Sequence, residues 1–216
     1  VASRGLGDVY KRQKQVLTFS FNKKNYHLKT QLIGKIQIKN LLMSILAAHK
    51  SNIKLDNILK SVENIKAVPG RFEEIGNFKN NSIAILDYAH TPDALETCIL
   101  NIKEQFKHRK VNLVFGCGGD RDKPKRSIMG KIANDLCDKI YLTDDNPRTE
   151  SPKKIRNNIK AKILKSKLVE IPSRKKAIEK AIKDLRSDEI LIVAGKGHEN
   201  YQEYKTKKFF SDKACM

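Results

Sequence analysis

The segment 143–150 (TDDNPRTE) gathers groups that could do chemistry around a single proline. It offers two neighbouring carboxylates, the amide of Asn146 and the guanidinium of Arg148, and it directly follows the short apolar run 139–142. An arginine can hold a carboxylate through two parallel hydrogen bonds, a geometry that a lysine does not reproduce equally well. The segment is therefore a candidate for recognising a ligand that carries carboxylates.

Three further polar segments follow apolar runs in the same way. They are 87–90 (DYAH), 116–123 (GCGGDRDK) and 195–199 (GKGHE). In an open parallel sheet, ligands bind beyond the carboxyl ends of the strands, so segments in this position can share one site. Four such clusters on one rim are hard to explain by folding alone, and they predict a common ligand site.

Each cluster also has a purely structural interpretation. Asp87 and His90 could contact a ribose and a base, or be a helix N-terminal acid and a surface imidazole. Arg121 and Arg148 could each bind a carboxylate or form a surface salt bridge. The glycines of 116–119 suit close approach of the backbone to an anion, although this run lacks the GK[ST] ending of a Walker A motif. Taken together, two arginines, an amide and an acid describe a site for a zwitterion with more than one carboxylate.

The chain before Pro69 predicts two strands followed by two helices. Alternating residues indicate strands over 16–21 and 26–32. Apolar residues then recur at helical spacing from Leu41 onward, with a second short helical segment at 55–62.

After Pro69 the pattern changes to apolar strands that alternate with amphipathic helices. Thr91, followed by Pro92, and Ser173 suit the N-cap positions of two of these helices. Strands that are apolar throughout and separated by helices imply an α/β fold, with a mostly parallel sheet covered on both faces. The tail 201–210 is expected to form a strand pair at the edge. The expected strands lie at 83–86, 111–115, 140–142, 168–171 and 190–194.

The composition is that of a globular protein with a high positive charge. The 216 residues include 44 Lys and Arg against 24 Asp and Glu, a formal net charge of +20. Such a balance is typical of proteins with anionic partners such as nucleic acid, but it also arises from solvated lysine-rich helix faces. The lysines are spread through the chain without a zinc-finger or RRM signature, which favours the second interpretation.

The four cysteines form no CxxC pair, which predicts free thiols in a reducing compartment. Cys117 lies in a polar cluster, but no base stands near it in the sequence, so we do not assign it as a nucleophile. No apolar run approaches the roughly 18 residues that a membrane span needs, and no signal-peptide pattern opens the chain. These features predict a cytoplasmic protein.

As a set, the clusters resemble the Mur ligase family, and within it the members that add diaminopimelate. The order and spacing of the motifs agree over residues 30–212, and the match is highly specific. The matching runs are LIG at 32–34 with Asn40, VPGRFE at 68–73, DYAHTPDAL at 87–95, FGCGGDRDKPKR at 115–126, DDNPRTE at 144–150 and AGKGHENYQ at 194–202.

The resemblance implies a Rossmann-like carboxyl-terminal domain over 69–216, in a slightly shortened form. Residues 14–68 are expected to be the tail end of the family's central ATPase domain, and 1–13 a non-native leader. The family uses ATP and Mg²⁺, but the GxxxxGK[ST] loop does not occur in this sequence, and the family's magnesium ligands belong to sequence outside it. We therefore assign no catalytic or metal-binding residue to this chain and expect it to be inactive alone.

The resemblance also implies two groups of ligand-binding residues. Arg148 is the informative one, because family members that add lysine generally lack this arginine and lysine has no distal carboxylate. The implied nucleotide contacts are Asn40 and Arg71 with the adenine nucleotide, Asp87 with its ribose and His90 beside it. The implied diaminopimelate contacts are Arg121, Asn146 and Arg148 with the carboxylates, and the Gly195 backbone with Glu199 for the distal ammonium.

The implied reaction is ATP-dependent amide formation in the synthesis of peptidoglycan precursors. The peptide carboxylate of UDP-MurNAc-L-Ala-D-Glu is phosphorylated, the amine of meso-diaminopimelate attacks the acyl phosphate, and phosphate leaves. The protein's part is largely positioning and neutralisation of charge.

Three alternatives stay open. A related ligase would add lysine or glutamate in place of diaminopimelate. A basic nucleic-acid-binding module would bind DNA or RNA tightly and with a steep dependence on salt. A purely structural fragment would expose a former domain interface and aggregate.

Overall fold

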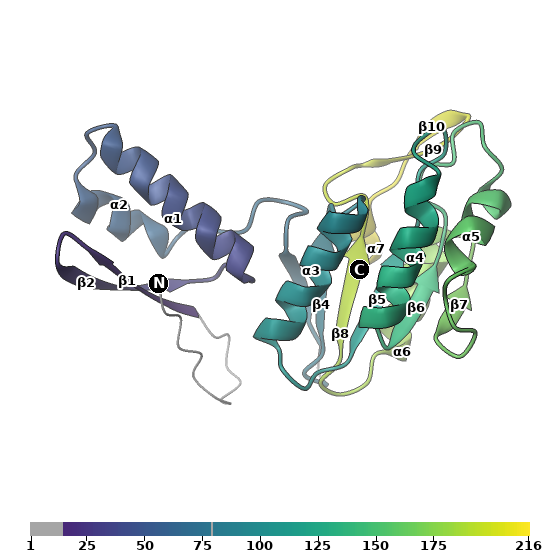
Figure 1. Ribbon diagram of the computed structural model, residues 1–216, viewed down its shortest axis with the longest axis horizontal. Helices are drawn as coiled ribbons and strands as arrows, with labels where there is room; N and C mark the ends of the chain where they lie inside the picture. The colour runs from purple at the N-terminus through teal and green to yellow at the C-terminus, as the bar shows by residue number, and fades with distance from the viewer. Residues whose placement is uncertain (1–14, 79) are drawn as a thin grey trace. The chain divides into compact units, whose positions relative to one another are not determined.

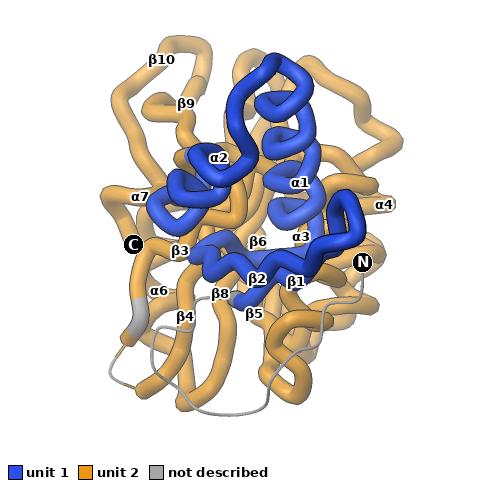
Figure 2. The backbone as a smooth tube through the Cα atoms, turned by 90° about the vertical axis from the view of Figure 1, so that its left-hand side faces the viewer, with its two compact units in different colours: residues 1–68 blue, residues 69–216 orange. Residues whose placement is uncertain are grey.

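The computed structural model describes residues 15–78 and 80–216 of the chain (Figure 1). The chain divides into two compact units, residues 1–68 and 69–216, which Figure 2 draws in different colours. The leader expected at residues 1–13 lies outside the described residues.

The first unit packs a β-hairpin against two helices. Its elements are β1 (Gln15–Phe21), β2 (Lys24–Thr30), α1 (Lys35–Lys50) and α2 (Leu55–Val62), which confirms the predicted order of strands and helices. Asn22 and Lys23 join the antiparallel strands and both have positive φ, the conformation of two-residue turns that match the strand twist. The shared core contains Leu17, Phe19, Leu28, Leu32, Leu41, Ile45 and Val62.

The second unit is built around a six-stranded, mostly parallel sheet. Its strands are β3 (Glu73–Asn77), β4 (Ile83–Asp87), β5 (Val111–Phe115), β6 (Lys139–Leu142), β7 (Leu168–Glu170) and β8 (Ile190–Ala194). They lie in the order β3-β4-β8-β5-β6-β7, and β3 alone among them runs antiparallel. This confirms the predicted α/β class. The sequence did not predict β3, because its five residues, EEIGN, contain a single large apolar side chain.

Helices cover both faces of this sheet. They are α3 (Pro92–Gln105), α4 (Pro124–Leu136), α5 (Pro152–Lys160), α6 (Arg174–Asp184) and the short α7 (Asp212–Cys215). In Figure 1, α3, α4 and α5 lie side by side on one face, and α6 lies with α7 on the other. Alternate residues of the central strand, Leu191 and Val193, pack in one buried cluster with Ala177 and Ile178 of α6.

The two predicted helix caps are present. The Thr91 hydroxyl accepts a hydrogen bond from the backbone N–H of Ala94, and the Ser173 hydroxyl accepts one from Lys176. Thr91 directly follows the cluster 87–90, so its cap fixes the point where that polar loop becomes α3.

The tail forms the expected strand pair, but its placement at the edge of the main sheet is wrong. β9 (Tyr201–Tyr204) and β10 (Thr206–Phe209) form a separate two-stranded sheet. The chain reaches them from the end of β8, whose neighbours β4 and β5 already occupy both of its sides. The hairpin therefore contacts the loop after β6 instead, through a bridge between Arg148 and Tyr204.

Candidate functional site

Four adjacent strands carry the four polar clusters on their carboxyl ends. Strands β4, β8, β5 and β6 are neighbours and parallel, so the loops that follow them emerge from one edge of the sheet. This is the arrangement that the alternation of strands and helices predicted. Of the expected site residues, Asn40 is exposed on α1 of the first unit, and the others belong to the second unit.

A hydrogen-bond network joins Asn146, Lys196 and Glu199 on this edge. The Lys196 ammonium lies 3.0 Å from Asn146 Oδ1 and 3.0 Å from Glu199 Oε2. The Asn146 amide nitrogen donates to the same carboxylate oxygen over 3.2 Å. The other oxygen, Glu199 Oε1, accepts a long hydrogen bond of 3.4 Å from the Tyr88 hydroxyl. Glu199 thus keeps one weakly engaged oxygen that can accept from a ligand ammonium.

Arg148 is held beside this network by its backbone and by two side-chain contacts. Its φ of +54° places it in the left-handed region, and its backbone bonds to Glu203 and Lys205 of the hairpin. Its Nη1 donates to the Gly119 carbonyl over 2.8 Å, and its Nε lies 3.4 Å from Glu203 Oε2. The guanidinium is 23% exposed and can reach a ligand. Its ion pair with Glu203 was not predicted from the sequence.

The loops after β5 and β6 are packed closely together. A Cβ added to Gly119 would lie 1.9 Å from the Pro147 carbonyl oxygen, so this glycine serves backbone packing. The Asp120 carboxylate accepts hydrogen bonds from the backbone and hydroxyl of Thr149. Arg121, on the same loop, is exposed and has no hydrogen-bond or ion-pair partner among the described residues. It is therefore available for an anionic ligand.

A buried ion pair locks these two loops. Arg126 is fully buried and donates through both terminal nitrogens to Glu150, over 3.0 and 2.8 Å, and through Nη2 to the Gly118 carbonyl. Hydrogen bonds from Arg126 lower the pKa of Glu150 to about 2. Glu150 is thus charged at neutral pH and serves the loop structure, although in the sequence it belongs to the candidate segment 143–150.

Asp87 organises the first loop of the edge. It is buried, and its two carboxylate oxygens accept hydrogen bonds from the backbone N–H groups of Phe72 and Ala89 over 2.9 and 2.8 Å. Burial raises the pKa of Asp87, while the two N–H groups act in the opposite direction. The contact with a ribose that the resemblance implies stays a prediction.

An aromatic and cationic cluster lies at the same end of the sheet. The Arg71 guanidinium lies 4.4 Å from the centroid of the Tyr88 ring, which makes a T-shaped contact with His90 and a tilted one with His198. Arg71, His90 and His198 are exposed. Tyr88 was part of the quoted motif, but we had given it no role. Its ring joins the expected nucleotide contacts, and its hydroxyl reaches Glu199.

The acids Asp144 and Asp145 face buried arginines and not the open edge. Arg156 of α5 pairs with Asp144, whose other oxygen accepts from the Tyr204 hydroxyl over 2.8 Å. Arg174 of α6 lies 3.7 Å from Asp145 Oδ2. The sequence did not reveal these arginines as site residues, because basic residues on helices usually are solvated. The available signal was that each lies among buried apolar residues of its helix.

The cysteines do no chemistry at this edge. Burial raises the pKa of the Cys117 thiol to about 12, so the thiolate that a nucleophile needs is not formed near neutral pH. Its sulfur lies 3.7 Å from the sulfur of Met129 in the interior. All four cysteines are free.

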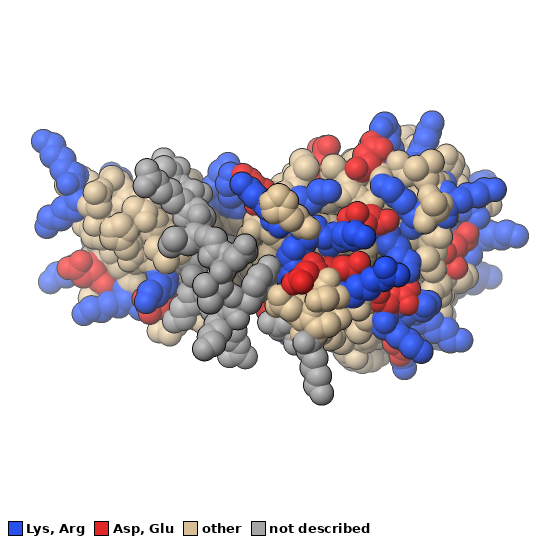
Figure 3. Space-filling model, turned by 90° about the horizontal axis from the view of Figure 1, so that it is seen from below, with Lys and Arg blue, Asp and Glu red and all other residues tan. Residues whose placement is uncertain are grey.

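Charge on the surface is mixed. On the face drawn in Figure 3, acidic side chains lie among the lysines and arginines of the second unit. This pattern favours solvated basic residues over a dedicated nucleic-acid surface. Among residues 15–78 and 80–216, no helix is both long enough and apolar enough to span a bilayer, and no three His, Cys, Asp or Glu side chains are grouped to bind a metal ion.

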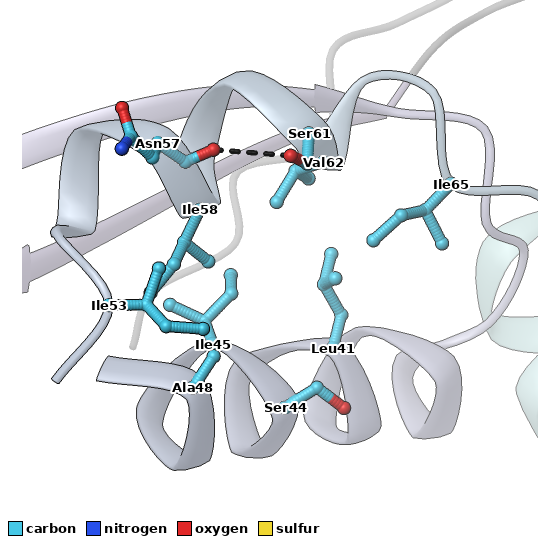
Figure 4. A pocket seen from close by; sticks show the side chains of 10 residues that line it. All are labelled: Leu41, Ser44, Ile45, Ala48, Ile53, Asn57, Ile58, Ser61, Val62 and Ile65. Atoms are coloured by element: carbon cyan, nitrogen blue, oxygen red, sulfur yellow. Dashed lines mark hydrogen bonds between the residues drawn. The ribbon is translucent and has the colours of Figure 1, made fainter. Parts of the chain in front are cut away.

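An apolar hollow between α1 and α2 is a different feature from the candidate site. Ile45, Ile53, Ile58 and other apolar side chains point into it, and Asn40 does not line it (Figure 4). The Ser61 hydroxyl at its border donates to the Asn57 carbonyl of its own helix over 3.1 Å. The hollow therefore offers no polar group for recognising a charged ligand.

Comparisons with known proteins place the edge in context. Residues 70–197 match the family described as Mur ligase, glutamate ligase domain. The UDP-N-acetylmuramoyl-L-alanyl-D-glutamate–2,6-diaminopimelate ligase of Rickettsia conorii is 46% identical over 201 residues, which cover 93% of this chain and 41% of that protein. The enzyme of the same name from Fusobacterium nucleatum is 45% identical, over 86% of this chain and 39% of its own length.

The fold comparison agrees. A solved structure of a UDP-N-acetylmuramoyl-L-alanyl-D-glutamate–2,6-diaminopimelate ligase superimposes with a TM-score of 0.69 at 33% identity. The match covers 93% of this chain and 41% of that one. The chain thus spans about two fifths of the length of the relatives that it matches.

Proposed function

This chain belongs to the Mur ligase family, and we propose that it supplies the amino-acid-binding part of an ATP-dependent ligase that adds meso-diaminopimelate to UDP-MurNAc-L-Ala-D-Glu. Because the chain spans about 41% of the Rickettsia conorii relative, the proposal assigns these residues a part in the reaction and not the whole of it. Its free cysteines suit a reducing compartment, and we propose a cytoplasmic location.

The single observation that carries the proposal is the spacing of opposite charges on one edge of the sheet. Arg148 and the amide of Asn146 can donate to a carboxylate, while Glu199, next to them in the hydrogen-bond network, can accept from an ammonium. The distal end of diaminopimelate carries both groups on one carbon. Lysine carries the ammonium there without the carboxylate, so Arg148 would have no partner in that ligand.

The roles that we assign to individual residues follow from their exposure. Arg148, partly exposed, binds the distal carboxylate, and Asn146 supports it. Glu199 Oε1, together with the Gly195 carbonyl, receives the distal ammonium. Arg121, exposed and unpaired within the described chain, receives the second carboxylate. Held at both ends, the ligand presents its remaining amine to the acyl phosphate, and this fixed orientation is the chain's contribution to rate.

The nucleotide side of the proposal rests on the cluster around Tyr88. Arg71 and His90 flank this ring and are exposed, as contacts with a bound nucleotide require. Asp87 fixes the loop that carries Tyr88. Asn40 is proposed as a further contact in the first unit. Mg²⁺ is expected to accompany ATP, and we assign it no ligand among the described residues.

The proposal is tested by titrating the isotope-labelled chain with meso-diaminopimelate and, separately, with L-lysine, while amide shifts are recorded by NMR. We expect meso-diaminopimelate to shift the backbone signals of residues 146–148 and 195–199 and to bind at least tenfold more tightly than lysine. Equal affinity for the two amino acids would point to another ligand of the same family. Absence of any shift with meso-diaminopimelate would refute the proposed function.

Glu203 is expected to weaken ligand binding, because its carboxylate occupies the Arg148 guanidinium that the ligand needs. The two groups are 24% and 23% exposed, so their ion pair is worth at most about 1 kcal/mol. Glu203→Gln should therefore tighten binding of meso-diaminopimelate, by up to roughly fivefold. Calorimetric titration measures this change.

The matched control is Glu179→Gln, on the exposed side of α6, which should leave the affinity unchanged. Weaker binding in Glu203→Gln would show instead that Glu203 holds Arg148 in its productive position.

A further inference from the structure

Lys196 is a buried ammonium at the centre of the candidate site, between the two glycines of the loop after β8. It has no exposed surface. Burying an unpaired ammonium is costly, so its partners reveal its role. Those partners are Asn146 Oδ1 and Glu199 Oε2, both at 3.0 Å, and the face of the Tyr201 ring, 5.1 Å from the ammonium nitrogen.

Lys196 determines which way the Asn146 amide points. The amide oxygen accepts from Lys196 and from the backbone N–H of Glu203, each at 3.0 Å, so two donors fill its acceptor capacity. The amide nitrogen must then face Glu199, to which it donates one hydrogen. Its second hydrogen has no partner among the described residues, and it can serve a ligand carboxylate.

Lys196 also determines which oxygen of Glu199 meets a ligand. Oε2 is engaged by Lys196 and Asn146, whereas Oε1 makes only the long contact with Tyr88 within the described structure. An incoming ammonium therefore meets Oε1. The charge of Lys196 further offsets that of Glu199, so the acid does not repel a carboxylate bound nearby.

We propose that Lys196 is a positioning residue that makes this site specific for the zwitterionic end of an amino acid. It does not touch the ligand. It turns the Asn146 amide into a donor for the carboxylate and leaves Glu199 Oε1 for the ammonium on the same carbon. This inference rests on the proposed function and adds a determinant of its selectivity.

Replacing Lys196 should affect the two candidate ligands differently. In Lys196→Met the amide of Asn146 loses one of the donors that orient it, and Glu199 keeps an unbalanced negative charge. A ligand with a distal carboxylate is then repelled, whereas a ligand with only a distal ammonium is not. We expect meso-diaminopimelate to bind at least tenfold more weakly and lysine to bind as well as before, or better.

The test is calorimetric titration of the 216-residue chain and its variants with each amino acid, alongside thermal unfolding. Lys131→Met, which removes an exposed lysine of α4, is the matched control and should bind both ligands normally. An equal loss of affinity for both ligands in Lys196→Met would indicate general loosening of the site and overturn the inference. Unchanged binding of meso-diaminopimelate in that variant would overturn it as well.

A second comparison applies should Lys196→Met fold poorly. Lys196→Gln keeps a hydrogen-bond donor without the charge, and its effect is measured in the native background and in Glu199→Gln. Because Lys196 acts partly through Glu199, its replacement should cost less in the Glu199→Gln background, whereas independent effects would add. Additivity would contradict the inference. Failure of the unsubstituted chain to bind meso-diaminopimelate would instead refute the proposed function itself.

Discussion

Arg148→Lys is expected to reduce the affinity for meso-diaminopimelate by roughly ten- to a hundredfold, with the affinity for lysine changed by less than about threefold. Hydrogen bonds to charged groups contribute about 1.5–3 kcal/mol each, and 1.4 kcal/mol corresponds to a factor of ten. A lysine at this position keeps the positive charge but not the planar fork that holds a carboxylate through two bonds. Calorimetric titration with both ligands measures the selectivity directly.

The control for this substitution is Arg186→Lys. Arg186 is exposed just before β8, at the opposite edge of the sheet, so its replacement should leave both affinities unchanged. Arg148→Ala should weaken meso-diaminopimelate at least as strongly as Arg148→Lys. If both Arg148 variants bind meso-diaminopimelate as the unsubstituted chain does, Arg148 is not the carboxylate-binding group.

Arg174→Met is expected to produce the largest loss of stability, about 3–5 kcal/mol in the free energy of unfolding. Arg174 and Asp212 are both buried and paired through two hydrogen bonds of 2.7 Å. Removing the arginine leaves the Asp212 carboxylate buried without a counter-charge. Arg174 also donates to the Ala194 carbonyl at the end of β8, so the loop that begins at Gly195 should lose its anchor. Urea unfolding measures the stability.

The double variant Arg174→Met with Asp212→Asn should recover part of this loss, because no charge then remains unpaired. Lys175→Met is the matched control on the same helix. Its side chain is 66% exposed and 3.8 Å from Glu179, so its removal should cost less than about 1 kcal/mol. Stability of Arg174→Met equal to that of the control would show that the buried pair contributes little.

The position of the site could be predicted from the sequence because it depends on local patterns. Each apolar run such as 111–115 is a strand, each polar segment after it is a loop, and parallel strands bring such loops to one edge. The motifs 144–150 and 194–202 then identified the family. Nothing in this step required knowledge of which strands are neighbours.

What the sequence could not provide are contacts between distant residues. Asp144 and Asp145 look as suitable for ligand binding as Asn146, and only the fold shows that arginines of α5 and α6 face them. Lys196 lies between glycines, where no periodicity indicates burial. The hairpin 201–210 was misplaced because β8 lies between β4 and β5, and the local sequence does not determine this strand order.

The most direct measurement is a crystal structure of the chain with bound meso-diaminopimelate. We expect the distal carboxylate within about 3 Å of the Arg148 guanidinium and the Asn146 amide nitrogen, and the distal ammonium at the same range from Glu199 Oε1. Binding of meso-diaminopimelate with its distal carboxylate away from Arg148 would contradict the assignment of this edge as the diaminopimelate site.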